Sequence, residues 1–302
     1  MPTTVFLNGA FVEPGEARVS AFDAGMQHAV GLFETLTAGN RGGDVRAERL
    51  AEHVDRLCAS ARDLGLSNDL RRDALIDAVL LTVKRSGLAR ARVRVTITAG
   101  DLSAGPRPAP GVTPPPPQSP TVLILAQPAT DYPEAMFERG VRVAIADARA
   151  NPFNPTEGHK TLNYWWRLRE LHRASAKGAA EALVFQITNH LAGGCVSNAF
   201  VVKGGVLLTP FARDDEGATL PSPVLPGVTR AALLEAAAEL GLEARRQMIT
   251  IDEVLGAEEV FLTNSSWGVL PVVAVERESI ADGKPGPMTV RLREALNAGM
   301  NL

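Results

Sequence analysis

Short strand-like apolar runs alternate with helical patterns along almost the whole chain. Strand-like runs cover residues 4–7, 10–12, 31–36, 92–98, 121–126, 141–146, 183–187, 199–202, 206–208, 259–263 and 271–275. Helical patterns cover residues 46–64, 70–85, 163–176, a segment that ends at Gly241, and 288–297. This alternation in both halves predicts layers of the α+β or α/β class and argues against a helix bundle or a β-sandwich.

Local signals support several of these elements. Asn8-Gly9 joins the first two runs and favours a tight hairpin, because both positions tolerate positive φ. Within residues 46–64, apolar residues recur at spacings of three and four, which is typical of one helix face. Thr250 and Glu253 have the spacing of a capping box, so a helix should begin there.

A length of 302 residues predicts two domains or one large α/β domain. Residues 105–120 are rich in proline and are expected to form an extended surface loop. Further prolines follow residue 126, and we interpret residues 127–136 as the linker between residues 1–126 and residues 137–302.

Composition excludes several classes of function. A net charge of −3 gives no reason to expect nucleic acid or an anionic membrane as partner. No apolar run reaches the roughly 20 residues of a membrane span and the N-terminus lacks a signal-peptide pattern, so we expect a cytoplasmic protein. Cys58 and Cys195 are expected to be buried free thiols, and the five histidines show no metal-ligand spacing, which predicts no metal site.

A single lysine, Lys160, lies where an irregular segment rich in Pro, Asn and Gly ends and a helical run begins. A solvated surface charge is one interpretation of a lysine at such a junction. The other is an amine held for Schiff-base chemistry, with its pKa lowered by burial or by a neighbouring cation. The residue type alone leaves both open.

Three arginines are similarly open to two interpretations. Arg56 lies beside the apolar stripe of its predicted helix, which is typical of a solvated arginine. Arg92 and Arg94 share one face of a predicted strand, where they could be surface charges or could bind a carboxylate in bidentate fashion.

Two hydroxyl-bearing turns have the composition of an anion site. Gly227-Val228-Thr229 precedes a helix, so backbone N–H groups, the helix dipole and a threonine hydroxyl could hold a phosphate, although an ordinary helix cap explains the pattern too. Asn264-Ser265-Ser266 breaks a strand and could supply further hydroxyls or be an ordinary turn. A lysine, a helix-borne arginine and these turns together suit pyridoxal phosphate, with the amine on the aldehyde and the other groups on the phosphate.

The chain resembles the class-IV aminotransferases, the fold-type IV pyridoxal-phosphate family of branched-chain aminotransferase, D-amino-acid aminotransferase and aminodeoxychorismate lyase. The matching blocks, in order, are Phe6-Leu7-Asn8-Gly9, Asp23-Ala24-Gly25, Gly31-Leu32-Phe33-Glu34-Thr35, His53-Val54-Asp55-Arg56-Leu57, His159-Lys160-Thr161-Leu162-Asn163, Glu181-Ala182-Leu183, Ser197-Asn198-Ala199-Phe200-Val201-Val202, Thr209-Pro210, Leu225-Pro226-Gly227-Val228-Thr229-Arg230 and Glu259-Val260-Phe261-Leu262-Thr263-Asn264-Ser265. The resemblance implies the two-domain, D-amino-acid aminotransferase-like fold, with a small N-terminal α+β domain, a larger cofactor-binding C-terminal domain, an active site between them and a homodimer.

By this resemblance Lys160 is the Schiff-base lysine. The implied cofactor-binding residues are Arg56, Lys160, Tyr164, Val228, Thr229 and Ser265. Tyr164 follows the lysine by four residues, where the branched-chain enzymes have five. The substrate-binding candidates are Phe33, Arg92, Arg94 and Ser266.

Two positions depart from the family pattern. Gly193 stands where members usually carry a glutamate that keeps the pyridine nitrogen protonated, so Gly193→Glu should raise transamination if a carboxylate fits there. Ala99 replaces the arginine of D-amino-acid aminotransferases, whereas Arg94 stands at the carboxylate-binding position of the branched-chain type.

Three functions follow from these observations. The first is a pyridoxal-phosphate-dependent aminotransferase that moves an amino group between an amino acid, bound by its carboxylate in branched-chain fashion, and a 2-oxo acid. The second is a 4-amino-4-deoxychorismate lyase that releases pyruvate and 4-aminobenzoate with the same lysine. The third, motivated by Gly193, is a catalytically impaired homologue that binds cofactor or a metabolite.

Overall fold

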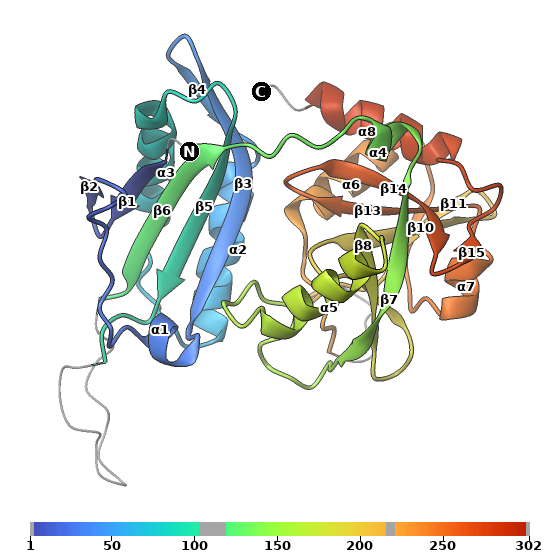
Figure 1. Cartoon of the computed structure of the whole chain (residues 1–302), viewed down its shortest axis with the longest axis horizontal. Coiled ribbons are helices and arrows are strands. Elements are labelled where there is room, and N and C mark those ends of the chain that lie inside the picture. The colour runs from blue at the N-terminus through green and yellow to red at the C-terminus, as the bar shows by residue number, and fades with distance from the viewer. Residues whose placement is uncertain (1–2, 103–118, 216–220, 300–302) are drawn as a thin grey trace, which may run out of the picture. The chain divides into compact units, whose positions relative to one another are not determined.

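The computed structural model of the chain describes residues 3–102, 119–215 and 221–299 (Figure 1). Most of the predicted proline-rich loop lies outside the described residues. Contacts divide the chain into two compact units. The N-terminal unit comprises residues up to Thr130 together with Lys160–Asn163, and the C-terminal unit comprises Asp131–His159 and the residues from Tyr164 onward.

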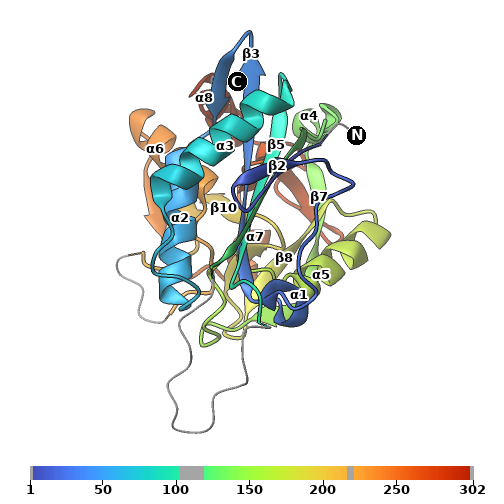
Figure 2. The ribbon, with the colours of Figure 1, turned by 90° about the vertical axis from the view of Figure 1, so that its left-hand side faces the viewer.

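The N-terminal unit is one antiparallel sheet with two helices on one face. Its strands are β1 (Thr4–Leu7), β2 (Ala10–Val12), β3 (Gly31–Arg41), β4 (Asp44–Ala47), β5 (Ala91–Thr98) and β6 (Thr121–Pro128), and its helices are α1 (Ala24–His28), α2 (Leu50–Asp63) and α3 (Arg72–Ser86). The strand order is β2-β1-β6-β5-β3-β4. Helices α2 and α3 lie on the same face of this sheet (Figure 2).

Strand β5 shows why one face of this sheet is covered. Val93, Val95 and Ile97 are buried among the side chains of α2 and α3, as the alternation in the sequence predicts. Arg92 and Arg94 alternate with them and are half-buried on the opposite face. The two candidate arginines therefore lie on the face without the helices.

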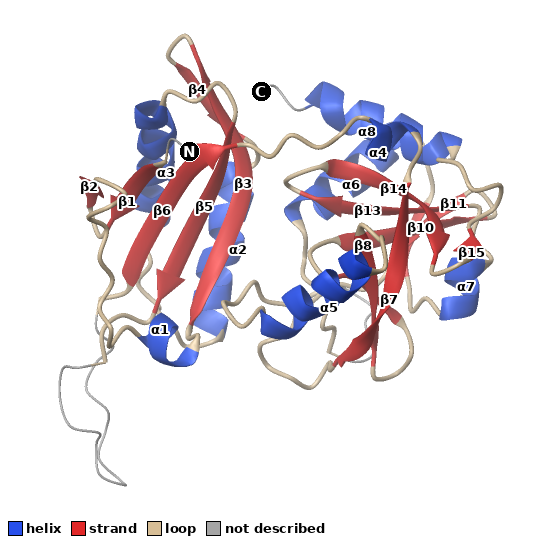
Figure 3. Cartoon of the chain, in the orientation of Figure 1, coloured by secondary structure: helices blue, strands red, loops and turns tan. Residues whose placement is uncertain are grey.

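The C-terminal unit is a mixed sheet with helices on both faces (Figure 3). Its strands are β7 (Val141–Ala150), β8 (Glu181–Gln186), β9 (Leu191–Gly194), β10 (Asn198–Lys203), β11 (Val206–Thr209), β12 (Ala244–Arg246), β13 (Glu259–Asn264), β14 (Gly268–Val275) and β15 (Glu278–Ser279). Its helices are α4 (Ala135–Glu138), α5 (Trp165–Ala176), α6 (Val228–Glu239), α7 (Ile251–Leu255) and α8 (Pro287–Gly299). The order is β12-β11-β10-β13-β14-β7-β8-β9, with β15 paired to β14.

Strand β10 is apolar on both faces because both faces are covered. Phe200 and Val202 pack in the cluster that contains the side chains of α6 and α8, and the Phe200 ring stacks on Phe261 with centroids 5.0 Å apart. Ala199 and Val201 pack in a second cluster with residues of α7. Strands covered in this way read as continuous apolar runs rather than alternating ones.

Most predicted elements form, with shifted ends. The first hairpin is confirmed, and Asn8 and Gly9 adopt φ of 48° and 93°. The helix expected from residue 46 begins at Leu50, because 44–47 instead pair with β3 and Arg49 adopts the left-handed conformation. The capping box at Thr250 is confirmed. Among the described residues no helix has both the length and the apolar character to cross a membrane.

Candidate active site

Lys160 is held by backbone bonds to the edge of β3. The N–H of Phe33 donates to the carbonyl of Lys160 at 2.9 Å, and the N–H of Leu162 donates to the carbonyl of Gly31 at 2.9 Å. The amine Nζ of Lys160 lies 4.5 Å from the centroid of the Phe33 ring. The lysine is therefore placed by a short strand pairing before its helix begins at Trp165.

Arg94 lies against the same ring. Its Cζ is 3.8 Å from the Phe33 centroid, and its Nε donates to the Thr96 hydroxyl at 3.3 Å. Arg92 is on the same face of β5, paired across the sheet with Thr37. Three of the candidates named from sequence, Lys160, Arg94 and Phe33, thus form one contact group within the N-terminal unit.

Arg56 is part of a buried ionic group and not a solvated helix charge. Its side chain is 12% exposed, and its Nε and one terminal nitrogen donate to the two oxygens of Glu34 at 2.8 and 2.6 Å. His53 Nδ1 lies 2.8 Å from the second Glu34 oxygen. Glu34 therefore sets the orientation of the Arg56 guanidinium.

The charges of this group are fixed by their surroundings. Burial opposes ionisation of Glu34, but the Arg56 charge and the His53 contact outweigh it and lower the pKa of Glu34 to about 2. Burial lowers the pKa of His53, and the Glu34 carboxylate acts against this shift.

Neither Glu34 nor His53 was identified as a site residue from the sequence. The signal was present, because His53 and Arg56 are three residues apart on one helix.

The start of α6 offers donors for an anion. Gly227 is the N-cap residue and supplies no side-chain cap, so the first N–H groups of the helix have no cap from it. The hydroxyl of Thr229 lies 3.2 Å from the hydroxyl of Ser265. Backbone N–H groups, two hydroxyls and the positive end of the helix dipole are the donors that suit a phosphate.

The turn after β13 is ordered by Asn264. Its Oδ1 accepts from the N–H groups of Ser266 and Trp267 at 2.9 and 3.1 Å, which makes an Asx turn. Thr263, directly before it, is buried, and its hydroxyl has no hydrogen-bond partner among the described residues. A buried hydroxyl without a partner costs free energy, so this turn has hydrogen-bonding capacity that the described part of the protein does not use.

Tyr164 and His159 flank the lysine segment and belong to the C-terminal unit. Tyr164 immediately precedes α5, and its ring lies 6.0 Å from the guanidinium of Arg167, which pairs with Glu157 at 2.7 Å. The Nε2 of His159 lies 3.1 Å from a terminal nitrogen of Arg213.

Gly193 lies in β9 with a φ of 144°. A Cβ at this position would come within 2.8 Å of the carbonyl oxygen of Ser197. The expectation that Gly193→Glu could introduce a useful carboxylate therefore meets an obstacle at the first side-chain atom, before the carboxylate is considered.

A different carboxylate, that of Glu181, contacts the residues that follow β9. Glu181 is fully buried in β8 and accepts from the N–H groups of Cys195 and Val196 and from the Ser197 hydroxyl, each at 3.1 Å. Burial raises the pKa of Glu181, and these hydrogen bonds lower it without offsetting the shift. Glu181 was not assigned a role from the sequence, where it lies two residues before the predicted strand 183–187 and belongs to one of the blocks that match the family.

The candidates fall into two groups, one in each unit. The N-terminal unit holds Phe33, Arg56, Arg92, Arg94 and Lys160. The C-terminal unit holds Tyr164, Val228, Thr229, Ser265 and Ser266.

Comparison with known proteins decides the family. Residues 31–275 match the family described as Amino-transferase class IV. The chain belongs to this family. Among class IV proteins, a putative branched-chain-amino-acid aminotransferase of Methanocaldococcus jannaschii is 31% identical over 295 residues, which cover 96% of this chain and 94% of that protein.

Solved structures of class IV proteins share the whole fold. The branched-chain amino acid aminotransferase of Escherichia coli has a TM-score of 0.86 and 27% identity, covering 98% of this chain and 93% of that one. A second branched-chain amino acid aminotransferase, solved with pyridoxamine 5′-phosphate, has a TM-score of 0.85 and 28% identity, covering 97% and 92%. The 4-amino-4-deoxychorismate lyase from Pseudomonas aeruginosa has a TM-score of 0.81 and 29% identity, covering 99% and 100%. The protein is therefore a class IV aminotransferase-family enzyme with the fold-type IV architecture that its sequence resembles.

Proposed function

We propose that this protein is a pyridoxal-phosphate-dependent aminotransferase that moves an amino group between an amino acid and a 2-oxo acid. The observation that carries the proposal is the group around Phe33. Lys160 Nζ and the Arg94 guanidinium lie 4.5 and 3.8 Å from the centroid of that one ring. An amine and a planar cation that both contact one ring suit a substrate with an amino group and a carboxylate on the same carbon.

The residues present fit the cofactor's phosphate. Val228 and Thr229 would offer backbone N–H groups, and the Thr229 and Ser265 hydroxyls, 3.2 Å apart, would bind from the side. Arg56, oriented by Glu34, is our further candidate for the phosphate. A structural relative holds pyridoxamine 5′-phosphate, which supports the same cofactor here. When bound, pyridoxal phosphate supplies the electron sink that amino transfer needs.

Protein side chains would do the remaining work. Arg94, at the branched-chain position, would bind the substrate carboxylate in bidentate fashion, with Arg92 on the same face of β5. Nζ of Lys160 would hold the proton that leaves the substrate's α-carbon and return it. Tyr164 would lie beside the cofactor, and Phe33 and Ser266 would line the substrate site.

An absorbance spectrum tests the proposal. The wild-type protein with pyridoxal phosphate should show a visible band from the covalent adduct with Lys160, and Lys160→Ala should lose it. Lys284→Ala, which removes a 78%-exposed amine of the same kind, should keep it. Identical spectra for wild type and Lys160→Ala would contradict the proposal.

The lyase is the second candidate because the match to aminodeoxychorismate lyase covers that whole chain at a TM-score of 0.81. Two assays separate the candidates. Amino-group transfer to 2-oxoglutarate supports the aminotransferase, and pyruvate release from aminodeoxychorismate supports the lyase. Cofactor binding with neither activity would support the impaired homologue instead.

A further inference from the structure

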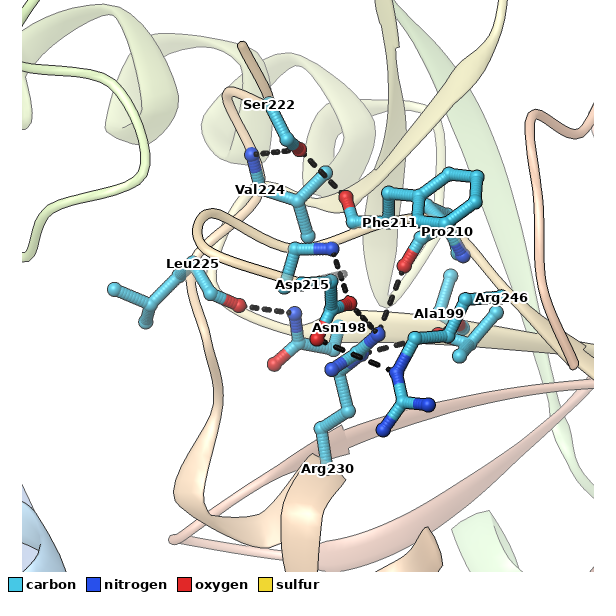
Figure 4. Close-up of polar contacts among 12 residues, drawn as sticks. Asn198, Ala199, Pro210, Phe211, Asp215, Ser222, Val224, Leu225, Arg230 and Arg246 are labelled. Carbon is cyan, nitrogen blue, oxygen red and sulfur yellow. Dashed lines mark hydrogen bonds and ion pairs between the residues drawn. The ribbon is translucent and has the colours of Figure 1, made fainter. Parts of the chain in front are cut away.

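Arg230 follows Thr229 directly, yet its guanidinium points into the interior of the protein (Figure 4). The side chain is 4% exposed. Its Nε donates to the Thr209 hydroxyl at 3.3 Å, and one terminal nitrogen donates to the Pro210 carbonyl at 3.0 Å and to the Asp215 carboxylate at 2.7 Å. All three partners lie in the segment 209–215, so Arg230 ties the first turn of α6 to that segment.

Asp215 completes this connection. The carboxylate oxygen that binds Arg230 also accepts from the N–H of Ala212 at 2.7 Å, and the other oxygen lies 3.3 Å from Nε of Arg246. Asp215 is 16% exposed and Arg246 is 48% exposed, so the pair with Arg230 is the buried one. Burial lowers the pKa of Arg230 and the Asp215 charge raises it, so each group stabilises the charged form of the other.

A second connection holds the chain just before α6. The Nδ2 of Asn198 donates to the Leu225 carbonyl at 2.9 Å (Figure 4). A Cβ on Gly227 would lie 1.9 Å from Oδ1 of Asn198. The N-cap residue is therefore packed directly on this side chain. Asn198 therefore holds the residues that precede the N–H groups of Val228 and Thr229, and Arg230 holds the helical turn that follows them.

We infer that Arg230 and Asp215 are positioning residues for the phosphate-binding turn at the start of α6. They fix the directions of its N–H groups before an anion binds, so less ordering is needed on binding. Arg230 acts through the helix turn and is not itself a phosphate ligand. This inference rests on the proposed function, because it needs a phosphate at that turn.

Asp215→Asn tests this inference, because electrostatics and loss of positioning predict opposite changes in phosphate affinity. The substitution removes a negative charge close to an anion site, so simple electrostatics predicts tighter phosphate binding. Loss of positioning predicts the opposite. We expect the Kd for pyridoxal phosphate to rise about tenfold, while the Kd for pyridoxal, which has no phosphate, changes less than about twofold. Each Kd is measured by titration of the purified protein.

Asp214→Asn is the matched control. It makes the same change one residue away, at a side chain that is 74% exposed and lies outside the Arg230 group. We expect both of its dissociation constants to equal those of the wild type. Unchanged or tighter binding of pyridoxal phosphate by Asp215→Asn would overturn the inference.

A double variant covers the case in which Asp215→Asn does not fold. Arg230→Met with Asp215→Leu replaces the buried ion pair by apolar groups, a change that proteins often tolerate. We expect it to fold and still to bind pyridoxal phosphate more weakly, with pyridoxal unaffected. Wild-type affinity for pyridoxal phosphate in that double variant would overturn the inference. A wild-type protein that binds pyridoxal and its phosphate equally well would overturn the proposed function itself.

Discussion

At the scale of single residues, carboxylates with little exposure orient two of the arginines described above and hold one turn. Glu34 orients Arg56, Glu181 holds the turn after β9, and Asp215 holds Arg230. Each is paired or hydrogen-bonded to several donors, as a buried charge must be. In the sequence Glu34 and Glu181 stand beside apolar residues, Asp215 stands in a charged run, and none of the three reveals its partners. Their partners lie far away along the chain, so the pairing could not be predicted from local pattern.

The lowered pKa of Glu34 leads to a prediction about stability at acid pH. Its pKa falls from 4.5 to about 2 on folding, so it contributes stability above pH 4.5 that is lost as the pH falls toward 2. A fall of this size corresponds to about 3 kcal/mol. Glu34→Gln should therefore lower the free energy of unfolding at pH 7 by about that amount and flatten its decline below about pH 4.5.

Urea unfolding at several pH values measures both effects. Glu52→Gln is the control, because Glu52 is on the same helix as Arg56, has a 46%-exposed side chain and pairs at the surface with Arg49. It should change stability by less than about 1 kcal/mol. An equal loss of stability in Glu34→Gln and Glu52→Gln would show that the buried ionic group of Glu34 is not the source of the loss.

At the scale of elements, strands and helices with a regular apolar pattern were predictable, and the first two strands have their predicted bounds, but the ends of most other elements were not predictable. The pattern in α2 extends back past Leu50, but pairing of 44–47 with β3 takes precedence over it. The turn Gly42-Gly43, with φ of 62° and 94°, was the available signal for that hairpin. Strand β9 was missed because Leu191–Gly194 is half glycine and is recognisable only by its pairing with β8.

Strand β9 gives the second prediction. Gly193→Ala should destabilise the protein by about 1–3 kcal/mol, because φ of 144° disfavours any side chain and the new Cβ would press on the Ser197 carbonyl. Thermal unfolding measures the change. Gly15→Ala, where a Cβ would meet no described atom within 4 Å and φ is not positive, should shift the midpoint little. If the two variants melt alike, the close approach at Gly193 is not as described.

At the scale of the molecule, each unit carries one buried cysteine. Cys58 lies in α2 of the N-terminal unit and Cys195 follows β9 in the C-terminal unit. Both thiols are free, as the sequence predicted. Burial raises the pKa of each thiol, and at Cys195 the Glu181 charge adds to the effect. Both should resist thiol reagents in the native protein.

This arrangement makes the two thiols separate reporters of unfolding. Labelling of Cys58→Ala and Cys195→Ala variants along a urea gradient should show each remaining thiol reacting only as its own unit unfolds. Coincident curves would mean that the units unfold together, and separated curves that they unfold in steps. Rapid labelling of either thiol without urea would contradict the burial described above.

Self-association is the remaining expectation at this scale. The N-terminal unit exposes large apolar side chains near α1, with Phe22 at 59%, Met26 at 76% and Val30 at 43%. Exposed apolar groups gathered in one short segment are typical of an interaction surface. We expect light scattering to give twice the monomer mass, and Met26→Lys to lower that value at low protein concentration. A monomer at all concentrations would contradict the expected homodimer.

The pairing of Lys160 and Leu162 with the edge of β3 has a consequence for chimeric proteins. Since the lysine is encoded in the second half of the gene but its backbone is anchored on a strand encoded in the first, neither half specifies the lysine's placement alone. Both anchoring bonds run from main chain to main chain. Exchanging residues 1–130 for those of a relative should therefore preserve the lysine's position where the donor supplies a strand of the same register with glycine at position 31, because a Cβ there would lie 2.6 Å from the Leu162 side chain.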